Sequence, residues 1–346
     1  MVARARRKLL GRFRQGVYHC TARCVRQMFL CGWDPLTGRD YSYRRNWIIQ
    51  REEQLAGLFA IDIEFRAELR THLHLMLRTM PEVARRWSPR EVALRWLTAT
   101  RLAKSFAKAL PKVDEELIED LVKDKKQIER LRRRLASVSW FMGFLCENVA
   151  RRANAEEDRV GHFWQARFRC RECTDKNAVL LCGIYVDLNL IRAGEADSLE
   201  SSPYTSIFQR LQARNQPKDA LNRADGWLGE LTWDVSHEQD ASRAYRSRTG
   251  RRASDLGLLP IKLEDYVRLL RYTLELLQSG RTTIPADMEA MLEGLDIRSE
   301  AWLETVERYD ETFTHAVGSP AGMAEVAQRM QVRALKGAPA SRRVFG

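Results

Sequence analysis

The sequence predicts an α+β protein: a split βαβ antiparallel sheet with one functional helix, a helical insertion and a helical C-terminal region. Three observations predict this class. Residues 71–77 alternate strictly between leucine and other side chains, which is typical of a strand. Residues 177–193 form a mostly apolar stretch of helical length. Residues 82–136 are highly charged and have helical character.

The first part of the sheet is expected before residue 80. Residues 16–23 are rich in strand-forming types and predict the first strand. Residues 48–60 carry apolar side chains at helical spacing, and the run 61–65 that follows is β-like. In the strand at 71–77, alternation places three leucines on one face and two histidines on the other. We expect the leucine face to join the core and the other face to present imidazoles.

The second part of the domain begins with the insertion. Its charges indicate a solvated helical face over residues 82–136, with DNA contact as the alternative. Residues 137–154 predict a helix with aromatic side chains inward, and residues 161–168 suit a strand or the approach to one. The apolar stretch 177–193 predicts a helix that ends at Gly194 in the manner of a C-terminal cap.

This order of elements matches a ferredoxin-like split βαβ plan with an antiparallel sheet, to which the last helix is an addition. We expect one domain over residues 1–210, with the insertion at about 82–136. Residues 211–253 form a polar linker, and residues 254–346 are expected to form an all-helical C-terminal domain. Its helices are predicted around 263–279 and 301–313, with a third that starts at Ser319-Pro320.

Composition narrows the class of partner. The chain has 346 residues, a formal charge of +12 and 45% hydrophobic residues, and its pI is near 9.6. A chain with this much apolar content folds, and its excess of Lys and Arg predicts an anionic partner. Charge alone does not choose between nucleic acid, a membrane surface and an acidic protein. The motifs must decide.

Location and redox state follow from three further features. The longest apolar stretch, 179–191, is interrupted by Asp187 and Asn189 and is too short to span a bilayer. The basic N-terminus lacks the apolar core and cleavage site of a secretory signal. We expect no membrane partner and a cytoplasmic, nucleoid-associated protein. Seven cysteines in a long chain favour reduced thiols over a disulfide framework.

His72 and His74 project to the same side of their strand, so both ring nitrogens can reach one divalent cation. Two unrelated surface or hydrogen-bonded histidines are the alternative.

Tyr185 and Asn189 are four residues apart on the apolar helix, which stacks them on one face. They offer a nucleophile beside a hard oxygen ligand. A tyrosine in an apolar helix is also typical of an amphipathic core residue.

Several segments together resemble the REP-associated tyrosine transposases, which belong to the HUH single-tyrosine transposases. The matching segments are YHCTAR at 18–23, THLHL at 71–75, GHFWQARF at 161–168 and YVDLNLIRAG at 185–194. They occur in the family's order and span most of the first 210 residues. Thr71 stands where the family usually has Asn, and Leu190 where it usually has Pro.

The resemblance implies a nuclease domain in which His72, His74 and Asn189 bind Mg²⁺ or Mn²⁺ and Tyr185 attacks a phosphate of single-stranded DNA. The products are a 5′-phosphotyrosine and a free 3′-hydroxyl, which can later rejoin strands. It also implies imperfect DNA hairpins as partners. The sequence does not determine the oligomeric state, and a homodimer is one assembly compatible with it. The alternative function is a catalytically inactive, domesticated protein that binds hairpin DNA.

Further DNA contacts are expected outside this set. The basic arm before residue 15 supplies Arg4, Arg6 and Arg7, and the first strand ends in Arg23. His19 either lines the DNA cleft or packs beside the histidine strand. Trp164 and Arg167 either stack on and neutralise DNA or form a buried indole with an exposed guanidinium. A zinc site from Cys20, Cys24, Cys170 and Cys173 is the weakest alternative, because the spacing is not that of a standard knuckle.

Overall fold

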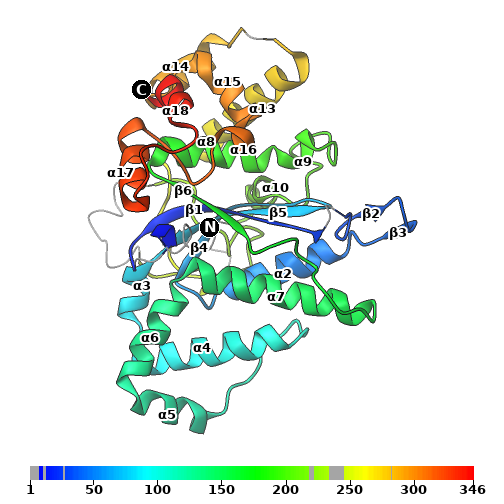
Figure 1. Cartoon of the computed structure of the whole chain (residues 1–346), viewed down its shortest axis with the longest axis vertical. Helices are drawn as coiled ribbons and strands as arrows, with labels where there is room; N and C mark the ends of the chain where they lie inside the picture. Colours follow the sequence, from blue (N-terminus) through cyan, green and yellow to red (C-terminus); the bar gives the residue numbers. More distant parts are fainter. Residues whose placement is uncertain (1–7, 11–12, 26–27, 218–221, 234–244, 282) are drawn as a thin grey trace.

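The computed structural model describes residues 8–10, 13–25, 28–217, 222–233, 245–281 and 283–346. A sheet lies in the middle of the molecule with helices on both faces (Figure 1). One face is covered by α2 (Arg44–Ala56) and α7 (Val138–Glu156), and the other by α8 (Lys176–Asp187). The predicted α+β class is confirmed. In the part of the chain that the structure describes, no helix has the length and apolar character needed to cross a membrane.

Within the described residues the sheet has five strands, in the order β4–β5–β1–β6–β7. They are β1 (Gly16–Arg23), β4 (Ile61–Glu68), β5 (His72–Thr79), β6 (Arg169–Cys173) and β7 (Ala316–Val317). The expected antiparallel pairing holds for β4 with β5, β5 with β1 and β1 with β6. A separate pair, β2 (Trp33–Asp34) and β3 (Arg39–Asp40), lies outside this sheet.

A β-bulge in β4 changes which side chains face α8. Pairing with β5 runs from Ile63 opposite Leu77 to Phe65 opposite Met76, so one residue of β4 is left over. Since side chains alternate between faces, the extra residue moves Phe65 to the face opposite that of Ile63. Phe65 there reaches α8 at Gly183, where an added Cβ would lie 2.7 Å from its ring. The bulge and the glycine together let α8 approach the sheet closely.

The predicted insertion is helical. It contains α3 (Pro81–Arg86), α4 (Pro89–Lys104), α5 (Glu115–Lys123) and α6 (Lys125–Leu135). Ser88 begins α4 with a capping box, in which its hydroxyl accepts from the Glu91 N–H and the Glu91 carboxylate accepts from the Ser88 N–H. These helices lie on the α7 side of the sheet, away from α8 (Figure 1).

Two of the expected elements differ in detail. Residues 161–168 are the approach to a strand, because β6 begins only at Arg169; Trp164 forms an isolated bridge to Cys24. The helix predicted over 177–193 is divided into α8 and α9 (Asn189–Arg192), with Leu188 between them. Gly194 follows with a φ of 66°, the left-handed conformation expected of a C-terminal cap.

The C-terminal helices follow the predicted positions. α13 (Leu263–Ser279) matches, and the helix expected at 301–313 is divided into α15 (Ser299–Glu307) and α16 (Tyr309–Thr312). α17 (Pro320–Met330) starts as predicted, with the Ser319 hydroxyl accepting from the Gly322 N–H. α14 (Ala286–Glu293) and α18 (Ala338–Phe345) complete the region.

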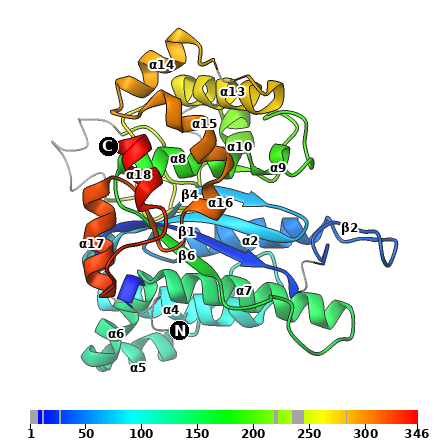
Figure 2. The ribbon, with the colours of Figure 1, turned by 45° about the horizontal axis from the view of Figure 1, so that its top comes forward.

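The expectation that this region is entirely helical is wrong, because it contributes β7 to the sheet. β7 runs parallel to β6, and the Glu172 and Thr174 N–H groups donate to the His315 and Val317 carbonyls. β7 thereby satisfies backbone groups along one edge of β6. Figure 2 shows α16 and α18 on the same side of the sheet as α8, and α17 at one end of the sheet.

The segment predicted as a polar linker packs against β4 where the structure describes it. It begins within α10 (Ser206–Ala213), and Trp227 and Leu228 beyond that helix are buried. The Asp62 carboxylate of β4 accepts hydrogen bonds from the Ala253 and Ser254 N–H groups. Backbone N–H groups at the end of this segment and just after it thus satisfy a buried carboxylate of β4. The domain boundaries at 210 and 253 stay a prediction.

Candidate active site

His72, His74 and Tyr185 lie together where α8 packs on β5. The two histidines project from the face of β5 that α8 covers, and their ring centroids are 4.9 Å apart. The His74 ring centroid lies 5.6 Å from that of Tyr185. Residues that are more than a hundred positions apart in the chain thus form one cluster.

Asn189 lies one turn beyond Tyr185, at the start of α9. Its Nδ2 is buried without a hydrogen bond of ordinary geometry among the described residues. Burial, followed by the charge of Asp310, raises the pKa of Tyr185 to about 12, and a hydrogen-bonding interaction with Asn189 opposes that rise. The phenol is therefore protonated near neutral pH, and Asn189 favours its ionised form.

His74 presents one free nitrogen to the cluster. Its Nδ1 lies 2.8 Å from Nε2 of His19 and 3.5 Å from the Thr21 hydroxyl. Its Nε2 is buried and has no hydrogen-bond partner among the described residues. When Nδ1 of His74 carries the proton and donates a hydrogen bond to Nε2 of His19, the lone pair of Nε2 of His74 is free to bind a cation. His19 is thus a partner that orients His74.

Both histidines of the pair are neutral near pH 7. Burial and then the positive charge of Arg23 lower the pKa of His72 to about 4. Burial lowers the pKa of His74 well below its usual value. The Nδ1 of His72 lies 2.8 Å from the Thr71 hydroxyl, which holds the ring in place. Neutral imidazoles are the form that coordinates a metal ion.

Two charged residues extend the cluster beyond His19. Arg171 lies opposite His19 in the β1–β6 register, and its Nη1 is 3.5 Å from Nδ1 of His19. The same Nη1 donates to Asp310 at 2.7 Å, and Asp310 also accepts from Arg23 at 3.0 Å. Neither Arg171 nor Asp310 is among the site residues predicted from the sequence. Strand register could have indicated Arg171, but nothing local connects Asp310 to β1.

Tyr309 covers the candidate nucleophile. Its ring stacks on Tyr185 with centroids 4.5 Å apart, and its hydroxyl donates to the Cys182 sulfur at 3.0 Å. Tyr185 is consequently only 5% exposed, and His74 is fully buried. Sequence reasoning missed Tyr309, because its partner lies in a different predicted domain.

Trp164 and Arg167, two further predicted DNA contacts, do not join the cluster. The Trp164 indole is half-buried and donates to the Cys146 carbonyl at 2.8 Å, and Arg167 is exposed. The indole is thus less buried than the indole-and-guanidinium alternative expects, and DNA contact by Arg167 stays a prediction. Arg4, Arg6 and Arg7 lie outside the described residues.

The structure gives no support to the zinc alternative. Cys20 and Cys170 face each other across β1 and β6 with sulfurs 4.0 Å apart. Within the described residues, no group of three or more His, Cys, Asp or Glu side chains is placed to hold a metal ion. The set of His72, His74 and Asn189 has only two members of these types.

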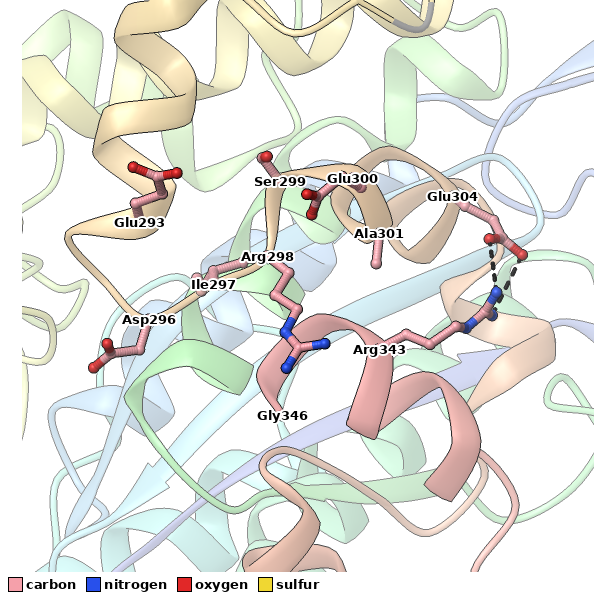
Figure 3. Close-up of a pocket in the computed structure, with 10 residues that line it drawn as sticks. All are labelled: Glu293, Asp296, Ile297, Arg298, Ser299, Glu300, Ala301, Glu304, Arg343 and Gly346. Carbon is pink, nitrogen blue, oxygen red and sulfur yellow. Dashed lines mark hydrogen bonds and ion pairs between the residues drawn. The ribbon is translucent and has the colours of Figure 1, made fainter.

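A separate hollow of about 750 Å³ lies in the C-terminal region (Figure 3). Its walls come from the loop before α15, from α15 and from the end of α18, and Arg343 pairs with Glu304 across it. Its other charged side chains are Glu293, Asp296, Arg298 and Glu300. Its lining has no imidazole, and the hydroxyl of Ser299 donates to Glu289 at 3.2 Å and has no base of the His type beside it, so the His72–His74–Tyr185 cluster is the better candidate for chemistry.

No protein-family model matches the sequence, and no curated protein matches it. Among solved structures, the chain is similar to a REP-associated tyrosine transposase bound to a REP hairpin, at 14% sequence identity. The similarity covers 58% of this chain and 82% of that chain, with a TM-score of 0.29. A TM-score this low supports no conclusion about fold or function.

Proposed function

We propose that this chain is a single-tyrosine DNA transposase that cleaves and rejoins hairpin-bearing single-stranded DNA. The observation that carries the proposal is the position of Tyr185. Its ring lies against His74, whose Nε2 has no partner among the described residues, and Asn189, whose Nδ2 also has none there, follows one turn later. A nucleophile beside an unsatisfied imidazole nitrogen and a loosely held amide is a costly arrangement in a purely structural core.

The donor set fits a hard divalent cation. His74 offers Nε2, His72 lies beside it, and Asn189 offers an amide oxygen; both imidazoles are neutral near pH 7. Bound Mg²⁺ or Mn²⁺ would supply polarisation of the scissile phosphate. His19 holds the His74 ring, as partners beyond the ligand shell commonly do for metal-binding histidines.

In the proposed reaction the Tyr185 oxygen attacks the phosphorus and the bond from phosphorus to the 3′ oxygen breaks. The phenolic proton is lost, the 3′ oxygen gains one, and the product is a 5′-phosphotyrosine. Asn189 favours the ionised phenol that this attack needs. Because the covalent product is itself a phosphodiester, a 3′-hydroxyl can reverse the attack and join a strand.

The strand connections support the ferredoxin-like part of the proposal. β1 and β4 are joined through α2, and β5 lies between them and is antiparallel to both. This order is the one expected of a split βαβ arrangement, in which β5 lies between β1 and β4 and α8 packs across its face. We further propose residues 1–210 as the catalytic domain and residues 254–346 as an appended helical domain.

A covalent-trapping experiment tests the function. Wild type, Tyr185→Phe and Tyr309→Phe are incubated with labelled single-stranded hairpin DNA and Mn²⁺ and separated under denaturing conditions. Tyr309→Phe is the matched control, since it removes the hydroxyl of the ring stacked on Tyr185. We expect an adduct from wild type and from Tyr309→Phe, and none from Tyr185→Phe. An adduct of equal yield from Tyr185→Phe would refute the assignment.

The second candidate is a hairpin-binding protein without catalysis. The observation that favours it is the burial of Tyr185 and His74 under Tyr309. It predicts hairpin affinity with no adduct from any of the three proteins, even after prolonged incubation with Mn²⁺.

A further inference from the structure

Arg23 and Arg171 hold one carboxylate between them. Nη2 of Arg23 donates to one oxygen of Asp310 at 3.0 Å, and Nη1 of Arg171 donates to the other at 2.7 Å. Two guanidinium groups that each bind a separate oxygen of one anion form the arrangement in which proteins commonly bind phosphate. Here two positive charges face a single negative one.

The two arginines are anchored in the sheet. Arg171 is buried in β6, and its Nε donates to the Phe313 carbonyl at 2.8 Å. Arg23 ends β1, and its Nε is buried without a hydrogen-bond partner among the described residues. Arg171 also lies 3.5 Å from His19, which bonds to His74. Arg171 is therefore held in place independently of the Asp310 side chain, Arg23 has a spare donor, and the pair borders the histidine cluster.

Asp310, in contrast, comes from α16, a helix of four residues. Its side chain is 26% exposed. Burial raises its pKa, but the charges of Arg171, His19 and Arg23 outweigh burial and hold the pKa below its usual value. The carboxylate is therefore ionised at neutral pH. It is an anion on a short, separate element placed in a site built by the sheet.

A hollow of about 360 Å³ borders this site. Arg171 and Asp310 line it together with the cationic side chains of Arg169 in β6 and Lys336 in the C-terminal region. A backbone that entered along this hollow would reach Asp310 and Arg171 from a basic surface.

We propose that Arg23 and Arg171 form a phosphate-binding subsite, that Asp310 occupies it as an internal anion, and that a backbone phosphate of single-stranded DNA replaces Asp310. The identity of the phosphate as DNA rests on the proposed function, whereas the anion subsite does not require Tyr185 chemistry. When α16 moves away with Asp310, Tyr309 leaves Tyr185 as well, so binding of the phosphate and exposure of the nucleophile are coupled.

The test compares Asp310→Asn with Glu311→Gln in the full-length protein. Both substitutions remove one negative charge from α16, but Glu311 is exposed and pairs with Arg308. The probe is a fluorescein-labelled oligothymidylate without a hairpin, and no divalent metal is added. We expect Asp310→Asn to bind it roughly tenfold more tightly than wild type, which is the effect of one favourable charged contact. Glu311→Gln should change the affinity less than about twofold.

Adding Arg23→Gln to Asp310→Asn should abolish the gain, and Arg23→Lys should restore part of it. Inorganic phosphate should raise the melting temperature of Asp310→Asn and not that of the double variant. The proposal is overturned if a folded Asp310→Asn binds like Glu311→Gln, or if the gain survives Arg23→Gln. Should Asp310→Asn fail to fold, Arg23→Gln in the wild-type background provides the test. The Arg23 side chain is 31% exposed, so we expect this variant to fold. It must then bind the oligothymidylate more weakly than wild type, because one of the two phosphate-binding guanidinium groups is lost.

These outcomes are separable from those of the proposed function. An Arg23-dependent gain with no Tyr185 adduct refutes the transposase reaction and retains the subsite. A Tyr185 adduct that forms equally in wild type, Asp310→Asn and Asp310→Asn with Arg23→Gln retains the reaction and overturns the subsite.

Discussion

Tyr309 stacks on Tyr185 with ring centroids 4.5 Å apart and an interplanar angle of 26°. The contact joins α16 of the C-terminal region to α8, which packs on the central sheet. Each ring removes apolar surface of the other from water, and Tyr309 is fully buried as a result. The candidate nucleophile and the C-terminal region are therefore one packing unit.

This stacking predicts that Tyr309 protects Tyr185 from reagents. Tyr309→Ala should lower the free energy of unfolding by about 3 kcal/mol or more, as expected when a buried aromatic ring is removed. In the protein that remains folded, Tyr185 should become open to nitration by tetranitromethane. Peptide mass spectrometry checks this, with the 41% exposed Tyr43 as the internal reference that reacts in both proteins. Equal protection of Tyr185 in a folded Tyr309→Ala would show that other groups shield it.

The free Nε2 of His74 predicts divalent-cation binding. His72→Gln and His74→Gln should each weaken Mn²⁺ binding, measured by calorimetry, by at least roughly tenfold, since even supporting groups commonly contribute that much. His162→Gln is the matched control, because His162 is exposed and lies outside the cluster. Hairpin binding without metal should persist in all three variants. Unchanged Mn²⁺ affinity in both cluster variants would remove the metal from the proposal.

The lowered pKa of His72 predicts a loss of stability in acid. An unfolded histidine takes up a proton near pH 6.5, whereas His72 in the folded protein does so only near pH 4. Between these values the unfolded state binds more protons, so the free energy of unfolding falls as pH falls, by up to about 1.4 kcal/mol per pH unit for each such histidine. Above pH 6.5 this contribution is constant.

Urea unfolding at pH 7.0 and 5.0 measures the effect. His72→Gln should lose less stability than wild type over this interval, because glutamine does not titrate. His162→Gln should behave as wild type does. If His72→Gln and wild type lose equal stability, His72 titrates in the folded protein as it does in the unfolded chain.

The basic arm predicts a part of the salt dependence of DNA binding. Replacing Arg4, Arg6 and Arg7 by Gln should reduce the slope of log affinity against log salt by up to about two, at roughly 0.7 per phosphate contact with single-stranded DNA. The three substitutions leave Lys8 and Leu9 unchanged, and these two residues attach the arm to the rest of the protein. Lys8 donates to the Met330 carbonyl at 3.0 Å, and Leu9 is buried. Replacing Arg268, Arg271 and Arg281 by Gln removes the same charge from exposed positions on and after α13. If both triple variants change the slope equally, the arm affects binding only through the net charge of the protein and does not contact DNA phosphates.

The local pattern of the sequence was sufficient for most elements around the candidate site. Strict alternation identified β5 and put His72 and His74 on one face, because side chains of a strand alternate by geometry. The spacing of Tyr185 and Asn189 put them on one helical face even though the helix is interrupted at Leu188. Ser319 and Pro320 marked the start of α17 by their capping chemistry.

Other features depend on contacts between distant parts of the chain. The β-like run 61–65 gave no sign of the bulge before Phe65, which divides the apolar side chains of β4 between two faces. β7 has only two residues, and it is a strand because the edge of β6 offers backbone partners. The pairing of Tyr309 with Tyr185 and of Asp310 with Arg171 joins residues more than 120 positions apart. No local periodicity records such contacts, because they arise when separate elements bury their surfaces together.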